Sequence, residues 1–265
     1  TAPAAGDKKD LLADLAGCAD NCISVEIALE GSDAATLTPL LPELVKVAVD
    51  TSKTKSQRGA AASALTKVKA TGSGQALFDA AKAADDFMLR GDLYAAAGAT
   101  GDDAVFTAAT AHLMSEAGWD DRVEIAHAVV PFGKRACDWA LAGLATAKTF
   151  SERSRYTNLI ADTATAAELP AISAALATLK EQMPKNDLAK TMIGLGDSAG
   201  LDVLKQALSS KDNLDRNDGA NALNSVADKV PAERKAEFLA LVEAAKASDT
   251  ARTMTPWDEL IGKLK

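Results

Sequence analysis

The stretch that decides the fold is residues 201–223, which reads LDVLKQALSSKDNLDRNDGANAL. Its first part, residues 201–208, is a short amphipathic segment, and a polar turn containing Asp212 follows it. Arg216 then opens a second segment, in which apolar or small residues stand three, four, six and seven positions after the arginine. Offsets of three, four and seven lie on one face of an α-helix. The stretch therefore predicts two helices joined by a turn, each with one face to bury.

The pattern after Arg216 recurs along the chain at a nearly constant interval. We take as anchors the basic residues Arg58, Arg90, Arg122, Arg155, Lys185 and Arg216. They are separated by 32, 32, 33, 30 and 31 residues, and apolar or small residues follow at similar offsets. The match is poorest after Arg155, where Asn158 and Asp162 stand at offsets three and seven. A period of this size is typical of proteins built from stacked helix pairs.

A further amphipathic segment precedes each anchor. These segments span residues 40–49, 75–84, 104–117, 135–146, 168–182 and 200–209, and 232–247 continues the series. One period is therefore predicted to hold a helix, a polar turn, a second helix opened by the basic residue, and a short link. A helix pair of this size cannot bury its apolar face alone, so neighbouring pairs must stack.

The composition favours an all-helical chain. Of the 265 residues, 57 are alanine, which has the best helix propensity, whereas only 4% are aromatic. The formal net charge of −8 argues against a nucleic acid or an anionic membrane as the main partner, because both require a basic surface. No apolar run approaches the length of a membrane-spanning helix, so no membrane insertion is expected.

The repeat resembles the HEAT-repeat family, and more closely its short HEAT-like form, first noted in phycobilin lyases. The resemblance rests on the apolar first helix at 201–208, on Asp212 in the turn, and on the Arg-x-x-x-Ala-x-x-Leu pattern that begins at Arg216. It covers about residues 8–250. It implies an all-α, right-handed α-solenoid of about seven antiparallel helix pairs. Residues 7–265 would form this single solenoid with terminal caps, after a flexible tether at residues 1–6.

The recurrent arginine and aspartate are expected to have a structural role. An arginine at the start of each second helix can reach the carbonyls of the turn and an aspartate of its own or the next unit. The pairs that suggest such contacts are Asp86–Arg90, Asp121–Arg122 and Asp212–Arg216. A ladder of this kind would fix the angle between neighbouring helix pairs, so we expect a spacing device rather than a ligand site.

Catalysis is not expected. The two histidines are His112 and His127, and Glu124 and His127 have the Glu-x-x-His spacing of carboxylate-bridged metal sites. Such a site needs a second motif and two further carboxylates, which the sequence does not supply. No Gly-x-Ser-x-Gly sequence marks a nucleophile, and no glycine-rich loop followed by lysine would hold a phosphate. We predict no enzymatic activity, no metal and no cofactor.

The outward face of the second helices is the predicted binding surface. If offsets three, four, seven and ten are buried, offsets one, two, five and eight face outward, and in HEAT-like proteins the second helices line the concave side. The candidate partner-binding residues on this face are Val123, Glu124, His127, Val130, Tyr156, Ile160, Lys190, Ile193, Asn221 and Asn224. The five large apolar side chains among them would form a docking patch. They are core residues instead if the assumed phase is wrong by one position.

Two functions fit these observations. The first is a non-catalytic scaffold or adaptor, acting as a monomer, that holds another protein or a peptide in the concave groove. The second follows from the resemblance to phycobilin lyases: a small-molecule or metal-handling protein that uses the neighbourhood of Glu124 and His127. An open concave surface favours the first function, and a closed pocket near His127 favours the second. A purely structural spacer would have no apolar groove.

The cysteines bear on the cellular compartment. Cys18 and Cys22 stand four residues apart and could form a disulfide in an oxidising compartment, although a regular helix would hold their Cα atoms near the upper limit for one. Cys137 is expected to be a small buried apolar residue. The cysteine pair, together with a first residue that is Thr1, weakly favours export to the periplasm or the extracellular space over the cytoplasm.

The last residues predict a short capping helix. Thr255 would be its N-cap and Pro256 its first residue. Its apolar residues form one stripe and are Trp257, Leu260, Ile261 and Leu264. So short a helix is not stable alone, so we expect it to dock on the helix at 232–247 with Trp257 as the anchor. Residues 8–30 are expected to cap the other end of the stack.

Overall fold

All regular elements of the described chain are helices. The computed structural model describes residues 8–18, 21–115, 121–249 and 255–265, and no strand occurs within these ranges. The predicted all-α class is thus confirmed for this part of the chain, whereas the tether predicted at residues 1–6 lies outside it. None of the described helices is long and apolar enough to cross a membrane.

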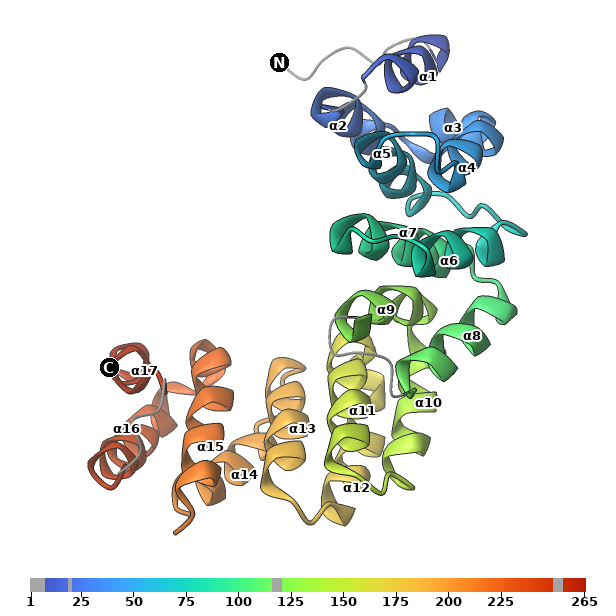
Figure 1. Ribbon diagram of the computed structural model, residues 1–265. Coiled ribbons are helices and arrows are strands. Elements are labelled where there is room, and N and C mark those ends of the chain that lie inside the picture. Colours follow the sequence, from blue (N-terminus) through green and yellow to red (C-terminus); the bar gives the residue numbers. More distant parts are fainter. Residues whose placement is uncertain (1–7, 19–20, 116–120, 250–254) are drawn as a thin grey trace. The chain divides into compact units, whose positions relative to one another are not determined.

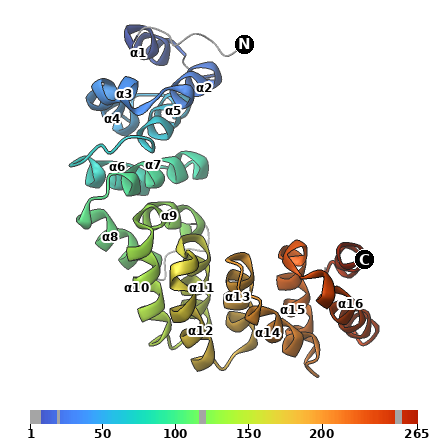
Figure 2. The same cartoon turned by 180° about the vertical axis from the view of Figure 1, so that it is seen from behind.

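The chain divides into two compact units, Thr1–Gly133 and Lys134–Lys265, which we call unit 1 and unit 2 and describe separately. Unit 1 opens with α1 (Lys8–Gly17), α2 (Ile23–Gly31), α3 (Ala34–Leu37) and η1 (Thr38–Leu40). Helix pairs follow: α4 (Leu41–Val49) with α5 (Lys55–Leu65), α6 (Gly74–Lys82) with α7 (Phe87–Ala99), and α8 (Asp103–Leu113) with α9 (Asp121–Val129), which η2 (Val130–Phe132) continues. The helices α2, α5, α7 and α9 pack against one another in that order (Figure 2).

Unit 2 repeats the same arrangement. Its pairs are α10 (Lys134–Leu144) with α11 (Phe150–Thr163), α12 (Leu169–Thr178) with α13 (Gln182–Gly194), α14 (Ala199–Leu208) with α15 (Asn213–Ser225), and α16 (Ala232–Ala247) with α17 (Trp257–Leu264). The single turns η3 (Ala166–Glu168) and η4 (Ala227–Lys229) lie in two of the links. The second helices α11, α13, α15 and α17 pack side by side in chain order, and the first helices form the other layer (Figure 1).

A side-chain cap defines the start of several second helices. Thr54, Asp86, Thr149 and Asp212 each accept a hydrogen bond from a backbone N–H of the first turn that follows. In α5 and α11 the cap is a full capping box, closed by Gln57 or Glu152. These caps satisfy amides that would otherwise have no partner, and they fix where each second helix begins.

The basic anchor stands four residues after the cap, and its guanidinium donates to a carbonyl of the preceding turn. The donor–acceptor pairs are Arg58 Nε to Ala48 O at 3.0 Å, Arg90 Nε to Ala84 O at 3.1 Å, Arg153 Nη1 to Ala147 O at 3.0 Å, and Arg216 Nη1 to Ser210 O at 2.8 Å. The predicted contact between anchor and turn is confirmed at these positions. The predicted pairing of Asp212 with Arg216 is wrong, because the Asp212 carboxylate accepts from Leu214 N–H as the cap of α15.

In the helix pair α10–α11 the anchor is Arg153. The prediction of Arg155 was wrong by two residues. Thr149 is the N-cap of α11, which places Arg153 at the position that Arg90 and Arg216 occupy in their own helices. Offsets three, four, six, seven and ten then fall on Tyr156, Thr157, Leu159, Ile160 and Thr163, of which all but the half-buried Tyr156 are buried. The two polar residues that seemed to interrupt the pattern, Asn158 and Asp162, are exposed.

Small residues allow the second helices to lie close together. The stripe after Arg58 is buried as predicted, with Ala61, Ala62 and Ala64 completely inaccessible. A Cβ atom added at Gly98 of α7 would stand 2.5 Å from the carbonyl oxygen of Ala128 in α9. Glycine is therefore required there by the approach of the neighbouring backbone.

The two neighbouring cysteines form a disulfide, Cys18–Cys22, with 5.1 Å between the Cα atoms. The bond is possible because α1 ends at Gly17 and α2 begins at Ile23, so the two cysteines lie between these helices and not within one regular helix. Cys137 is a buried free thiol, as predicted.

The C-terminal helix docks as predicted. Trp257 is 7% exposed and its Nε1 donates to Asp249 Oδ2 at 2.9 Å. Leu260 and Leu264 are buried, and α17 packs on α16 and on α15. The expected N-terminus is wrong by one residue: Pro256 is the N-cap and no side chain caps the helix.

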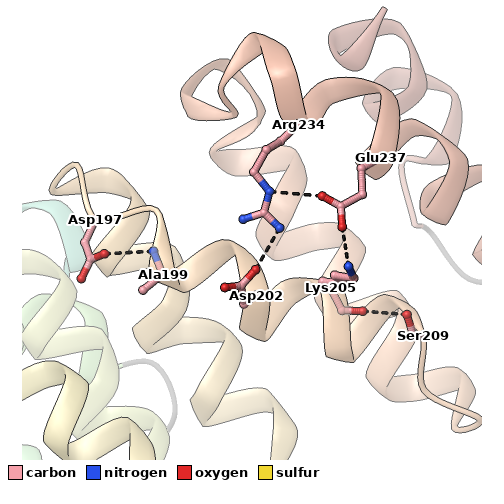
Figure 3. Close-up of polar contacts among 7 residues, drawn as sticks. All are labelled: Asp197, Ala199, Asp202, Lys205, Ser209, Arg234 and Glu237. Atoms are coloured by element: carbon pink, nitrogen blue, oxygen red, sulfur yellow. Dashed lines mark hydrogen bonds and ion pairs between the residues drawn. The ribbon is translucent and has the colours of Figure 1, made fainter.

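The first helices of unit 2 are joined by charged side chains. Arg234 of α16 donates to Asp202 of α14 at 2.9 Å and to Glu237 at 3.2 Å, and Lys205 of α14 also binds Glu237 (Figure 3). These hydrogen bonds hold the pKa of Glu237 below its usual value. The charges on this part of the first-helix layer therefore already have partners within the chain.

The anchors should be more important for stability than exposed ion pairs. Replacing Arg153 or Arg216 by alanine leaves turn carbonyls without a donor, and we expect the free energy of unfolding to fall by about 2 kcal/mol. Arg216→Lys should recover only part of this loss, because lysine cannot reproduce the guanidinium fork. Thermal or urea unfolding measures the effect. The control is Lys46→Ala, which removes the exposed pair Lys46–Glu43; if it were as destabilising as Arg153→Ala, the anchor contacts would have no special role.

Removal of residues 255–265 should lower the melting temperature and promote aggregation, because it uncovers apolar surface of α15 and α16. Trp257→Ala alone should cost about 3–5 kcal/mol, as for a large aromatic side chain in a core. Asp258→Ala, on the exposed side of α17, is the matched control and should change little. An unchanged melting temperature and unchanged monodispersity after truncation would mean that α17 is not a cap.

Candidate functional site

Beyond its first turn, the exposed side of α11, α13 and α15 is mostly polar. At two and five residues after each anchor, these helices carry Arg155 and Asn158, Asp187 and Lys190, and Asp218 and Asn221. We call these six residues the second-helix face of unit 2. Because these helices pack side by side (Figure 1), residues at the same offset from the anchor follow one another across three repeats.

Hydrogen bonds between neighbouring helices hold the two carboxylates of this face. Thr157 Oγ1 donates to Asp187 Oδ2 at 3.2 Å, and Asn186 Nδ2 donates to Asp218 Oδ2 at 2.7 Å. The amide of Asn186 is itself held by Gln182, 2.9 Å away. Burial raises the pKa of both Asp187 and Asp218, and the hydrogen bonds offset this only in part. The second-helix layer thus keeps carboxylates where ionisation is costly.

Asparagine side chains form a stripe along α15. Asn217, Asn221 and Asn224 are four and three residues apart and therefore lie on one side of the helix. Asn217 is only 6% exposed, yet neither its side-chain oxygen nor its nitrogen has a hydrogen-bond partner among the described residues. Asn224 donates to Glu259 at 3.3 Å, while its buried Oδ1 also lacks a partner. We call these three residues the asparagine stripe.

The unpaired amide of Asn217 is costly for the fold. Asn186, the residue at the same position of α13, is completely buried, but its amide accepts a hydrogen bond from Gln182 and donates one to Asp218. A buried polar group without a partner costs about 1–3 kcal/mol. An amide offers both donors and an acceptor, so the stripe presents groups that match the N–H and C=O of a peptide backbone.

The asparagine stripe ends at a hollow. This hollow has a volume of about 610 Å³ and is lined by Asn224, Ser225, Asp228, Lys235 and Lys263. Lys263 donates to the Asn224 carbonyl oxygen at 3.1 Å and forms an ion pair with Glu259 at 2.7 Å. The hollow is thus a polar, charge-balanced continuation of the stripe between α15, α16 and α17.

Four predicted site residues lie in unit 1, on α9 and η2. Val123 is 69% exposed, His127 is exposed, and Glu124 and Val130 are half-buried. One carboxylate oxygen of Glu124 is buried without a hydrogen-bond partner among the described residues. Within the same described part of the chain, no three His, Cys, Asp or Glu side chains are grouped so that they could hold a metal ion.

Three predicted site residues do not belong to an exposed patch. Ile160 and Ile193 are 0% and 3% exposed, so their prediction as surface residues is wrong. With Arg153 as the anchor, Ile160 occupies a core offset, and Ile193 packs towards Gly200 at the start of α14. Tyr156 of α11 is half-buried against α10, where its ring centroid lies 5.2 Å from that of Trp139. The apolar patch predicted across these units therefore does not form.

Three other predicted residues do come together. Lys190 and the polar members of the C-terminal repeat, Asn221 and Asn224, lie on the solvent side of α13 and α15. The structure adds Asp187, Asp218 and Asn217 to them. Asp187 and Asp218 stand at the outward offset two residues after the anchor, as Asp92 does in unit 1, but they were not among the predicted partner-binding residues.

Asp92 is the equivalent carboxylate of unit 1. It lies against Gly59 of α5, where an added Cβ atom would stand 3.3 Å from its Oδ2. Burial, together with the negative charges of Glu26, Asp86 and Glu30, raises the pKa of Asp92 to about 6. The second-helix layer of unit 1 therefore also holds an acid at a position that disfavours its charge.

The raised pKa predicts that Asp92 destabilises the fold at neutral pH. In the unfolded chain this carboxyl ionises near pH 4, so the folded state holds the proton more tightly and the free energy of unfolding falls as the pH rises from about 4 to about 6. Asp92→Asn should raise the melting temperature at neutral pH by about 2–4 °C, after allowance for partial exposure. The gain should vanish near pH 4. Asp79→Asn, on the exposed side of α6, is the control; a gain for Asp92→Asn at every pH would contradict the assignment.

Comparisons of the chain with models of protein families, with curated proteins and with solved structures found no match.

Proposed function

We propose that this chain is a HEAT-like α-solenoid that acts as a non-catalytic adaptor and holds a segment of another protein on its second helices. The paired helices, the anchor arginines near one interval and the two layers of each unit support the HEAT-like assignment. A right-handed solenoid of about seven pairs is the arrangement that this family resemblance implies.

The observation that carries the binding function is the unpaired amide of Asn217 within the asparagine stripe. A natural sequence rarely keeps a buried amide without partners unless the group is used. The amide atoms of Asn217 and the Oδ1 of Asn224 are buried, so a peptide laid along α15 meets the exposed amide of Asn221 first and pairs with the other two once their side chains turn outward. Lys190, Asp187 and Asp218 on the adjacent side would then select the charges of that peptide.

The Cys18–Cys22 disulfide supports placing the protein in an oxidising compartment, since such bonds persist mainly in exported proteins. We therefore propose that the adaptor works outside the cytoplasm. Its partner is then expected among exported proteins.

Two matched variants test the binding surface. Asn221→Arg places a long cation on the asparagine stripe, whereas Gln206→Arg makes the same change on the exposed side of α14 in the same repeat. The immobilised chain and both variants are incubated with an extract of the source cells, and the retained proteins are quantified by mass spectrometry. We expect a protein that the wild type and Gln206→Arg retain and Asn221→Arg does not. If Asn221→Arg loses no retained protein, the stripe is not the binding surface.

The two buried asparagines should respond oppositely to replacement by leucine. Asn217→Leu removes an unpaired amide and should raise the melting temperature by about 3 °C or more, while abolishing retention of the partner. Asn186→Leu breaks two hydrogen bonds and leaves the Asp218 carboxylate without a donor, so it should lower the melting temperature. A fall for both variants would show that the Asn217 amide is needed for folding rather than for binding.

A further inference from the structure

Large apolar side chains are exposed in the first turn of three consecutive second helices of unit 2. Phe150 of α11 is 47% exposed, Met183 of α13 is 42% exposed and Leu214 of α15 is 75% exposed. The first turn of a helix is where acidic and small polar residues are favoured, because the backbone amides and the helix dipole attract negative charge. Apolar residues at this position in three successive repeats need a reason other than the fold.

A lysine stands immediately before the N-cap of each of these helices. Lys148, Lys180 and Lys211 precede Thr149, Glu181 and Asp212, and all three lysines are exposed. None of the three ammonium groups makes an ion pair or a side-chain hydrogen bond with the residues that the structure describes. We call the three lysines with Phe150, Met183 and Leu214 the turn edge of unit 2.

The carboxylates of the same edge are already in use. Glu152 accepts from the N–H groups of Lys148 and Thr149, Glu181 pairs with Arg153 at 2.7 Å, and Asp212 accepts from Leu214 N–H at 2.7 Å. The lysines are thus the charges of this edge left for a ligand. Residues 134–265 carry 18 basic and 18 acidic side chains in all, whereas residues 1–133 carry 11 and 19.

The turn edge is linear and periodic. The N-termini of α11, α13 and α15 lie at the lower edge of unit 2 in Figure 1, and the Arg153–Glu181 ion pair joins the first two. Packed helices stand about 8–10 Å apart, so each step along the edge presents one lysine and one apolar side chain. In unit 1, α7 also begins with exposed Phe87 and Met88, but Asp85 stands before its N-cap, so the combination with lysine belongs to unit 2.

A protein segment fits this edge better than an anionic membrane does. A membrane surface averages over nearby charges, and Glu152, Glu181, Asp212 and Asp215 would offset three lysines there. A partner segment places each of its carboxylates beside one ammonium group, and it gains from the regular spacing of the apolar side chains. A regular spacing of lysines and apolar side chains can be matched by a polypeptide, whose own side chains stand at fixed intervals, but not by a fluid lipid surface.

We propose that the turn edge of unit 2 docks a segment of a partner protein that is acidic and carries apolar residues. The apolar residues contact Phe150, Met183 and Leu214, and carboxylates beside them pair with Lys148, Lys180 and Lys211. Leu214 stands three residues before Asn217 and so lies on the same side of α15 as the asparagine stripe, whereas the lysines, Phe150 and Met183 lie outside the stripe. The docking proposed for the turn edge does not depend on the function proposed for the stripe.

Selection from a phage-displayed library of random peptides tests the proposal. The target is the whole chain, and the counter-target is the triple variant Lys148→Glu, Lys180→Glu and Lys211→Glu. The enriched peptides should carry an excess of acidic residues together with apolar ones. Their affinity should fall by about ten-fold or more in the counter-target and after Phe150→Ser, Met183→Ser and Leu214→Ser. The lysine-dependent part should weaken with added salt, whereas the apolar part should persist.

The matched control is Lys53→Glu, Lys69→Glu and Lys82→Glu, which makes the same change of net charge in unit 1 and should leave the affinity unchanged. All variants must keep the wild-type melting temperature, as exposed substitutions do. The proposal is overturned if selection enriches no acidic peptides or if the turn-edge variants bind as the wild type does. Flotation of the chain with phosphatidylcholine–phosphatidylserine vesicles, lost in the lysine variant, would also overturn it and identify a membrane as the occupant.

Discussion

The hydrogen bond from an anchor guanidinium to a carbonyl just before the second helix is the contact on which the repeats of Arg58, Arg90, Arg153 and Arg216 depend. It connects the end of a first helix, or the turn that follows it, to the start of the second, and Arg58 and Arg216 are each only 8% exposed. A charged group is kept inside only where its donors are used. Once the contact is made, the rotation of the second helix is set, and the offsets that face the core follow from the helical period.

With this rotation, only a small part of the surface of each second helix is exposed to solvent. Within each unit, an inner second helix such as α7 or α13 contacts the first helix of its pair and a second helix on either side, so three of its sides are covered. The residues left to solvent are those two and five positions after the anchor, together with the first turn. In unit 2 this narrow surface holds Asp187, Lys190, Asp218 and Asn221, with the asparagine stripe beside it. The constraint that builds the fold therefore also determines which side chains a partner can meet.

The same constraint explains what sequence reasoning could and could not foresee. The helix pairs and their order follow from periodicity, because apolar offsets of three, four and seven are a property of the chain alone. Periodicity does not determine which residues of α11 face the core. Arg153 and Arg155 are both basic, and only the Thr149 cap shows which of them is the anchor. The error moved Tyr156 and Ile160 onto the wrong side of the helix. Ile193 was missed for another reason: it packs on Gly200 of the next pair, a contact that no local pattern records.

The two layers of unit 2 differ in how well their polar groups are satisfied. On the first-helix layer, Arg234, Asp202, Glu237 and Lys205 bind one another (Figure 3). On the second-helix layer, Asn217 has no partner among the described residues, two carboxylates are held where burial raises their pKa, and Leu214 is 75% exposed. Stability alone would remove such features, because each has a less costly substitute. Their concentration on one layer is what a binding role of that layer, as proposed above, would require.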